Sequence, residues 1–348
     1  MSEPNWDEVV EQLGFDPDVW EVDQRYPVQV RSWDAADGQR LFYYKASVAP
    51  KLEFQEDVSE LIREVKRRKP ARVQVEESGR WLVVCLADWQ AGKSDHGGVK
   101  ALAERLYRLR DLVPARVREL KRAGRPVDGI LVMGLGDMVE NCDGHYPMQS
   151  FQVEWDQRQQ ERFVRRVLVD LLSEWVKLVP RMRVGAVPGN HGENRSGGKA
   201  FTSFDDNADL SVFETVQEIL SRNSDVFGHV EWVLPVEDMS LVVDLDGQLL
   251  AFAHGHQARS GSGPAGKLRS WWRAKMDANH PVGDAKILVS GHYHHLQVVQ
   301  DGNRTWFQCP ANDGGSRWFE EQGGPTTACG TLTFTVDDGG WDDLKVLS

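Results

Sequence analysis

The sequence predicts an α/β fold: a four-layer α/β/β/α sandwich of two facing mixed sheets, with helices on both outer faces and a small N-terminal α+β appendage. Between residues 81 and 187, three apolar runs alternate with two long helical patterns, the arrangement of βαβ units. After residue 207 the apolar runs become shorter and follow one another closely, which indicates a second sheet. The 348 residues suffice for one large domain with a small appendage.

Residues 1–78 differ from the rest and predict a small α+β region of unknown role. Its expected elements are a helix over 5–13, strands over 28–33 and 40–48 around the turn Asp37-Gly38, and a helix over 58–69. The last helix ends in the basic run Lys66–Lys69 before Pro70, which suits a helix carboxyl terminus or a contact with nucleic acid. Because the region is too short for a large core, we expect it to pack on the main domain.

Residues 79–348 predict the main domain. Its expected helices cover 97–122, 155–178 and 207–222, and its expected strands cover 81–87, 128–133, 182–187, 229–234, 240–244, 248–253, 286–289, 296–299, 305–308 and 329–336. Pro114 is expected to bend the first helix. The last three strands are expected to be antiparallel, and a Gly/Ser-rich, basic insertion covers about 255–283.

The composition bounds the class of protein. A formal net charge of -12 argues against a chain coated in basic residues for nucleic acid, although a local basic groove stays open. The same charge suits a site that gathers divalent cations. No apolar run approaches the ~20 residues of a membrane helix, and no secretory signal begins the chain, so we expect a cytoplasmic protein without a membrane partner. The four cysteines form no C-x-x-C pair and are expected to be free thiols.

Polar side chains follow five predicted strands at the point where each strand ends. In open α/β sheets, sites lie at the carboxyl ends of the strands. Carboxylate, amide and imidazole groups together suit Mn²⁺, Fe²⁺ or Zn²⁺. These candidate metal ligands are Asp88, Asp137, Asn190, His254, His292 and His294. The glycines of Pro188–Asn194 allow a sharp turn and a close approach to a ligand.

In order and spacing, these motifs resemble those of the calcineurin-like metallophosphoesterase superfamily, over about residues 80–336. The motifs are Asp88-Trp89-Gln90, Gly136-Asp137, Gly189-Asn190-His191-Gly192-Glu193, His254 and Gly291-His292-Tyr293-His294. The resemblance implies the metallophosphoesterase-like sandwich and a phosphoesterase activity. More loosely, the chain resembles the DNA-repair nucleases of the SbcD type within that superfamily.

The resemblance also implies a site with two divalent ions, Mn²⁺ first, with Fe²⁺ or Zn²⁺ as alternatives. One ion would be held by Asp88, Asp137 and His294, with Gln90 as a further candidate ligand, and the other by Asp137, Asn190, His254 and His292, with Asp137 bridging. A metal-bridging hydroxide would attack the phosphorus. His191 would protonate the leaving oxygen or stabilise charge on it, so the implied catalytic residues are His191 and Asp137.

The chain departs from the superfamily pattern at two positions. Gln90 stands where the pattern has histidine; either it ligates as a weaker donor, or it does not ligate and His96 or water takes its place. Glu193 stands one residue later than the usual acid and could accept a hydrogen bond from an imidazole.

Several residues are candidates for contacts with the substrate. Arg195 suits a phosphate oxygen or an ordinary exposed loop position. The stretch 259–275 carries Arg269 and Arg273 beside Trp271 and Trp272. That stretch predicts either a surface for a nucleic acid strand or an amphipathic helix whose tryptophans pack inward. His145 and Tyr146 are candidates for the rim of the site or are ordinary loop residues. His256 is a candidate for supporting the ligands from behind.

From these features we expect phosphodiester hydrolysis in DNA, with a phosphoester substrate as the main partner. A phosphatase or phosphodiesterase for a small nucleotide or a phosphoprotein is the alternative. A metal-binding module with weak or no catalysis is a second alternative, favoured only by Gln90. A partner subunit or a homo-oligomer stays open.

Overall fold

The computed structural model divides the chain into two compact units, residues 1–55 and 56–348. It describes residues 5–13, 17, 20–22, 28–34, 40–46, 48–50, 58–71, 73, 77–235, 237–315, 317–321 and 328–348. The smaller unit contains α1 (Trp6–Gln12), the antiparallel pair β1 (Trp20–Val22) and β4 (Val48–Pro50), and the hairpin β2 (Gln29–Asp34) and β3 (Arg40–Lys45). The expected helix and hairpin strands are therefore present, and the turn Asp37-Gly38 lies outside the described residues.

Helix α2 (Val58–Arg67) belongs to the larger unit, although the predicted boundary was residue 78. Its apolar residues Leu61 and Val65 are fully buried, and the Asn223 side chain donates to the Val65 carbonyl at 2.8 Å. The helix is amphipathic, and it buries its apolar stripe by packing beside residues 208–220, a helix of the main domain. The periodicity of residues 58–69 predicts the stripe but not the helix that covers it.

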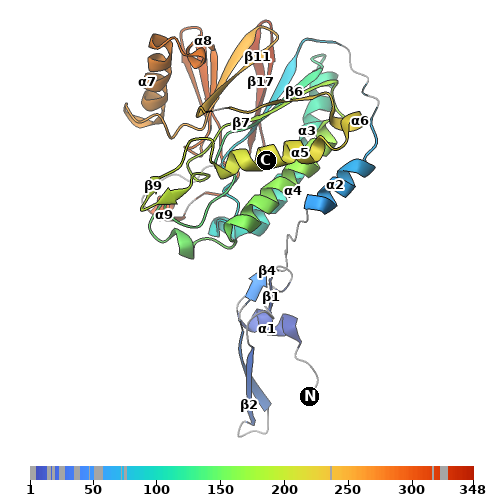
Figure 1. Ribbon diagram of the computed structural model, residues 1–348, viewed down its shortest axis with the longest axis vertical. Coiled ribbons are helices and arrows are strands. Elements are labelled where there is room, and N and C mark those ends of the chain that lie inside the picture. Colours follow the sequence, from blue (N-terminus) through green and yellow to red (C-terminus); the bar gives the residue numbers. More distant parts are fainter. Residues whose placement is uncertain are drawn as a thin grey trace. The chain divides into compact units, whose positions relative to one another are not determined.

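The first large sheet has the order β10-β7-β6-β5-β16-β17. Its four parallel strands are β5 (Trp81–Leu86), β6 (Gly129–Gly134), β7 (Arg181–Ala186) and β10 (Val230–Val233), and its two antiparallel strands are β16 (Thr331–Asp337) and β17 (Gly340–Leu347). Helices α3 (Gly98–Arg122), α4 (Gln157–Trp175) and α5 (Ala208–Leu220) lie on one side of it (Figure 1). Strands β5 and β6 are continuous, fully buried apolar runs because helices cover one face of the sheet and a second sheet covers the other.

The second large sheet has the order β11-β12-β13-β15-β14. Its strands are β11 (Ser240–Leu245), β12 (Gln248–Ala253), β13 (Ile287–Ser290), β14 (Gln297–Asp301) and β15 (Arg304–Gln308). Strands β12, β13 and β15 are parallel, and β11 and β14 are antiparallel edge strands. Helices α7 (Gly263–Asp277) and α8 (Pro281–Asp284) pack on this sheet, on the side away from the first sheet (Figure 1).

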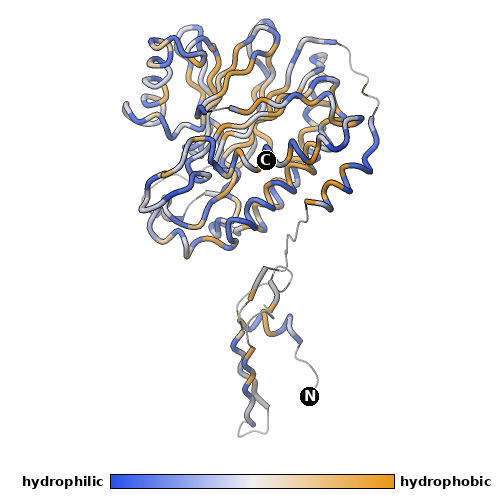
Figure 2. Tube along the Cα trace, viewed as in Figure 1, coloured by the Kyte–Doolittle hydropathy of each residue, from blue (hydrophilic) through white to orange (hydrophobic). Residues whose placement is uncertain are grey.

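The main core lies between the two sheets. Side chains of both contribute to one buried cluster, among them Val83, Leu131, Phe252, Val289 and Phe307. Figure 2 shows the strands of both sheets mainly in the hydrophobic colour, whereas the covering helices alternate. The α/β/β/α sandwich predicted from the sequence is therefore confirmed.

The last three predicted strands each have an antiparallel neighbour, as expected: β14 pairs with β15, and β16 pairs with β5 and β17. Strand β16 thereby joins the first sheet, and β15 also runs parallel to β13 on its other side. Pairing partners are chosen by burial between distant segments, so an apolar run does not reveal them. The remaining short elements are α6 (Ser224–Phe227), α9 (Arg317–Glu321), β8 (Arg195–Ser196), β9 (Lys199–Ala200) and 3-10 turns at Asp95–Gly97 and Gln149–Phe151.

Candidate metal centre

Strand ends from both large sheets bring four predicted ligands together. Asp137 follows β6, Asn190 follows β7, His254 follows β12 and His292 follows β13. His254 Nε2 lies 3.0 Å from Asp137 Oδ2 and 3.1 Å from Asn190 Oδ1. Ligand atoms of Asp137, His254 and His292 all lie within 4.8 Å of one another. The site therefore forms where the carboxyl ends of the two parallel sets meet.

The arrangement of these atoms fits a divalent ion. His254 Nδ1 lies 2.7 Å from the carbonyl oxygen of Leu135, so we place the ring hydrogen on Nδ1, which leaves the Nε2 lone pair for a ligand. Two ligand atoms that each bond one ion at about 2.1 Å, with about 90° between the two bonds, lie about 3 Å apart. The distances from His254 Nε2 to its two oxygen neighbours match this value.

The charges at these ligands are linked. Burial lowers the pKa of His254, but the carboxylate of Asp137 outweighs it and raises the pKa to about 9. A proton on Nε2 therefore takes the position that a bound cation would take. Burial and the neighbouring His254 lower the pKa of His292 to about 2, so this imidazole is neutral and able to ligate.

Several residues of the site have a strained backbone conformation. Five non-glycine site residues have left-handed backbone angles, with φ of 50° at Asp88, 42° at Gln90, 52° at Asp137, 75° at His292 and 59° at His294. Each such residue costs about 1–3 kcal/mol, and such residues cluster at functional sites.

A close approach of two loops explains the Gly-Asp and Gly-Asn motifs. A Cβ on Gly136 would lie 2.6 Å from the Gly189 Cα, and a Cβ on Gly189 would lie 2.1 Å from the Asp137 nitrogen. Only glycine at both positions lets the loops after β6 and β7 come together and present Asp137 beside Asn190.

Asp209, which the sequence analysis missed, holds these loops in place. Its buried carboxylate accepts the backbone N–H groups of Asp137 at 2.8 Å, Met138 at 2.9 Å and Gly189 at 3.0 Å. Asn207, the N-cap of α5, donates to the Gly189 carbonyl at 2.9 Å. The local signal was an N-cap sequence before an apolar helix, which gives no hint of which backbone its side chains reach.

The remaining predicted ligands lie in a second group, where their atoms have other partners. His294 Nε2 lies 3.3 Å from Asp88 Oδ1, and Asp88 also accepts the backbone N–H of His292 at 3.1 Å. Gln90 is buried, and its Oε1 accepts from the Lys93 ammonium at 2.9 Å. The structure thus brings Asp88 and His294 together and turns the Gln90 oxygen toward a lysine.

Lys93 and Asp313 are the second omission of the sequence analysis. Lys93 Nζ lies 2.5 Å from Asp313 Oδ2, and that carboxylate also lies 3.4 Å from His294 Nδ1. Burial lowers the pKa of Lys93, but Asp313 and Glu140 raise it above the usual value, so the amine stays charged. Asp313 follows β15, so it repeats the signal of a polar side chain after an apolar strand, five residues past Gln308.

His191 lies beside the ligands and is supported by Glu140, a third omission. Its Nδ1 lies 2.9 Å from the Glu140 carbonyl oxygen and 3.4 Å from the Glu140 carboxylate, and Tyr146 donates to that carboxylate at 2.6 Å. Burial lowers the pKa of His191, but Glu140 and Asp137 raise it to about 9. His145 stacks on the ring, with centroids 4.4 Å apart and planes 8° apart.

The tautomer of His191 follows from its neighbours. Because the Gln90 oxygen faces the Lys93 ammonium, the Gln90 amide nitrogen faces His191 Nε2, at 3.3 Å. We therefore assign the N–H to Nδ1 and a lone pair to Nε2. The Gln90 amide donor favours the neutral ring of His191. Glu140 acts in the opposite direction and raises the pKa of the ring, so Nε2 is able to take up a proton.

Arg195 and Glu193 bind each other. The Arg195 guanidinium lies 2.8–2.9 Å from one Glu193 carboxylate oxygen, and the other oxygen lies 3.5 Å from His256 Nε2. The Glu193 carboxylate thus faces the His256 imidazole rather than that of His191. The predicted phosphate contact of Arg195 would have to compete with this ion pair.

The 255–283 insertion forms α7 and places its tryptophans inward, contrary to the nucleic-acid interpretation. Trp272 is 6% exposed and donates to the Val282 carbonyl at 2.9 Å, and Trp271 packs against the same cluster. Arg269 and Arg273 are exposed, and each lies 3.2 Å from the carboxylate of Asp301. Trp272 is not available to stack a base because it attaches the helix to the second sheet.

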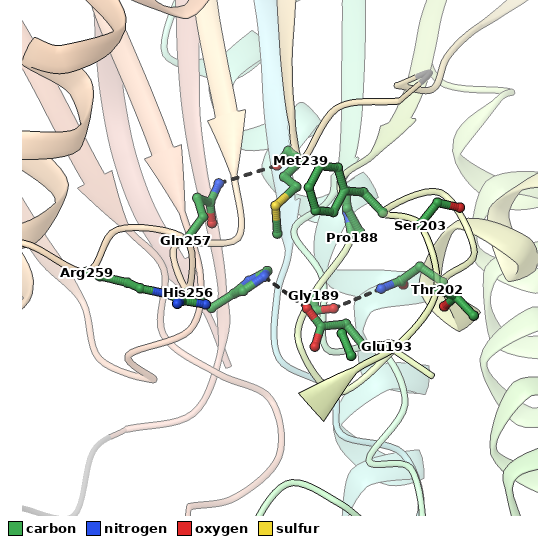
Figure 3. Close-up of a pocket in the computed structure, with 12 residues that line it drawn as sticks. Pro188, Gly189, Glu193, Thr202, Ser203, Met239, His256, Gln257 and Arg259 are labelled. Carbon is green, nitrogen blue, oxygen red and sulfur yellow. Dashed lines mark hydrogen bonds and ion pairs between the residues drawn. The ribbon is translucent and has the colours of Figure 1, made fainter. Parts of the chain in front are cut away.

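A pocket of about 320 Å³ borders the metal centre (Figure 3). One wall is formed by the loop after β7 and the chain before α5, and the other by the loop after His254. In Figure 3 His256 reaches across toward Glu193. The lining residues are Pro188, Gly189, Glu193, Ala200, Thr202, Ser203, Phe204, Asn207, Met239, His256, Gln257 and Arg259.

Comparisons with solved structures give matches of low identity. A predicted phosphoesterase from Streptococcus pneumoniae is 13% identical, with 74% of this chain and 84% of that chain covered and a TM-score of 0.31. Vps29 from Entamoeba histolytica complexed with Zn²⁺ is 14% identical, with 76% and 98% covered and a TM-score of 0.33. An archaeal phosphodiesterase is 12% identical, with 76% and 99% covered and a TM-score of 0.34. Two of these proteins are described as a phosphoesterase and a phosphodiesterase.

No protein-family profile and no curated protein matches the chain. Among the described residues, no helix combines the length and the hydropathy that a bilayer crossing requires.

Proposed function

We propose that this protein is a divalent-metal-dependent phosphoesterase. The observation that carries the proposal is the convergence of Asp137 Oδ2, Asn190 Oδ1 and His254 Nε2, with His292 beside them, at the joined ends of two sheets. When bound there, a divalent ion supplies Lewis-acid polarisation of a phosphoryl oxygen and lowers the pKa of a water molecule.

The chain's own residues would orient the substrate and move protons. The backbone N–H of His191 donates to Asp137 Oδ1 at 2.7 Å, which fixes His191 to the metal loop. Its Nδ1 is held by Glu140, so Nε2 is the atom that exchanges a proton with an attacking water or a leaving oxygen. The stacked His145 limits rotation of the ring.

The pocket in Figure 3 supports a small organic group on the substrate. Its volume is at the small end of the range for ligand sites, and its walls combine apolar Pro188, Met239 and Phe204 with polar His256 and Glu193. We therefore favour a phosphodiester or phosphomonoester of nucleotide size. DNA remains the competing substrate, supported by the exposed Arg269 and Arg273 but not by the inward-facing tryptophans.

One screen tests both levels of the proposal. The purified protein is assayed with Mn²⁺, Fe²⁺, Zn²⁺ or chelator against a chromogenic phosphodiester, a chromogenic phosphomonoester and linear DNA. We expect turnover with metal, none in chelator, and faster cleavage of the small esters than of DNA. No turnover of any ester with any metal would contradict the proposed activity and favour a binding module.

Charge reversal at α7 separates the substrates. If DNA is the substrate, Arg269→Glu with Arg273→Glu should impair its cleavage, most clearly at low salt, and spare the small esters. If DNA cleavage is unchanged, the helix takes no part in substrate binding. A matched control is Lys100→Glu, a change at an exposed position of α3.

A further inference from the structure

We propose that the site binds one divalent ion and that the Lys93 ammonium is its second cation, standing in for the second ion that the motif resemblance implies. The inference rests on the proposed metal-dependent function and concerns the number of ions. It starts from a contrast between the two halves of the predicted ligand set. Around His254 the atoms of four predicted ligands lie close together, whereas the Gln90 oxygen is already bound to the Lys93 ammonium.

The Gln90 oxygen is not available as a ligand. It accepts a hydrogen bond from Lys93 Nζ at 2.9 Å, and the amide nitrogen on the other side lies 3.3 Å from His191 Nε2. Turning the amide over would place its NH₂ group against the ammonium, two donors facing each other. The neighbours of Gln90 therefore fix its oxygen on the lysine.

The ammonium is itself fixed. Lys93 is 9% exposed and its partner Asp313 is 1% exposed, with Nζ and Oδ2 2.5 Å apart. Removing either partner alone would leave a buried, uncompensated charge, so the pair is a stable part of the site. Lysine also has no acceptor with which it could contribute to a metal site while it is charged.

An ion at the predicted first position would lie close to this charge. An ion bonded to the Gln90 oxygen at about 2.1 Å could lie no farther than about 5 Å from a lysine nitrogen that is itself 2.9 Å from that oxygen. Like charges at that separation disfavour each other. The ammonium supplies at this end of the site the positive charge that a second ion would otherwise bring.

The other predicted ligands of the first ion do not compensate for the loss of the Gln90 oxygen. His294 lies between two carboxylates, with Nε2 3.3 Å from Asp88 and Nδ1 3.4 Å from Asp313. Asp88 and His294 are thus two ligands, and the third, Asp137, already faces His254. Two ligands with a lysine beside them make a weak site, whereas the neighbouring position has four.

The number of ions can be measured directly. The metal-depleted, full-length protein is titrated with Mn²⁺ by calorimetry, and the loaded protein is examined by elemental analysis and electron paramagnetic resonance. We expect one tight ion per chain with the hyperfine-split signal of an isolated Mn²⁺. Two tight ions, or the signal of an exchange-coupled pair, would overturn the inference while leaving the phosphoesterase proposal intact. No bound ion would overturn both.

A paired variant tests the role of the lysine. Lys93→Met with Asp313→Asn removes both charges together and releases the Gln90 oxygen, and adding Gln90→His supplies the missing imidazole. We expect the triple variant to bind a second Mn²⁺ at least on the order of tenfold more tightly than any second ion bound by the wild type. The control Lys100→Met changes an exposed lysine of α3 and should leave the stoichiometry at one. A triple variant that folds and still binds one ion would refute the role of Lys93, and the wild-type stoichiometry decides the number of ions even if the triple variant does not fold.

Discussion

Replacing Asp209 by alanine should loosen the two loops that carry the metal ligands. The Asp209 carboxylate is fully buried and accepts the backbone N–H groups of Asp137, Met138 and Gly189 at 2.8–3.0 Å. Alanine leaves those three donors buried without an acceptor. Because Asp137 is a ligand and Gly189 directly precedes one, we expect losses of both stability and metal affinity.

The size of the effect follows from the three hydrogen bonds. Hydrogen bonds to a charged group contribute about 1.5–3 kcal/mol each, so three give roughly 4–9 kcal/mol. Burial of the Asp209 carboxylate next to Asp137 raises the pKa of Asp209 to about 6. The buried charge therefore offsets part of the stability gained from the hydrogen bonds, and we expect a loss at the lower end of that range. A loss of about 4 kcal/mol is a large part of the 5–15 kcal/mol that stabilises a typical domain.

Urea unfolding at neutral pH, followed by fluorescence, measures the loss of stability, and calorimetry with Mn²⁺ measures the affinity. Asp209→Asn keeps one acceptor oxygen and should lose less than the alanine variant. Glu214→Ala, an exposed position on the same helix α5, is the matched control and should stay within about 0.5 kcal/mol of the wild type. If Asp209→Ala costs no more than that control and binds Mn²⁺ unchanged, the carboxylate does not hold the loops.

Three further outcomes follow. Asp137→Asn should abolish turnover and weaken Mn²⁺ binding, because it removes the charge opposite His254; full activity in a metal-free protein would contradict a metal mechanism. His191→Ala should lower kcat by ~10²–10⁴-fold while the Mn²⁺ stoichiometry measured by calorimetry stays unchanged, with a smaller loss for a nitrophenolate leaving group; loss of metal would make His191 a ligand instead. Burial alone would raise the pKa of Asp128, but Arg181 and the backbone N–H of Ser78 hold it below its usual value. Asp128→Asn should therefore destabilise the protein at pH about 7 and progressively less as the pH falls below about 4, in urea midpoints measured at both ends. An equal loss at both ends would show that the charge plays no part.

The sequence by itself determined the layers and most of the residues that meet at the candidate site. Strands β5 and β6 are uninterrupted apolar runs because both faces are buried, and a run of this kind is visible without any partner. The polar residue after each run marks a strand end, which is why Asp137 and Asn190 were found. The number and order of those ends, rather than any one motif, predicted a metal site.

The tertiary structure decided which atoms meet. Lys93 and Asp313 are 220 positions apart, and Glu140 reaches His191 across 51 positions, so no local pattern connects them. The inward packing of Trp272 and the pairing of β16 with β5 were likewise settled by the burial of distant surfaces. Periodicity indicates which face of one segment is buried and which is exposed to solvent. Hydrogen bonds and ion pairs depend instead on which segments become neighbours. Those neighbours are fixed only when the two sheets pack on a common core.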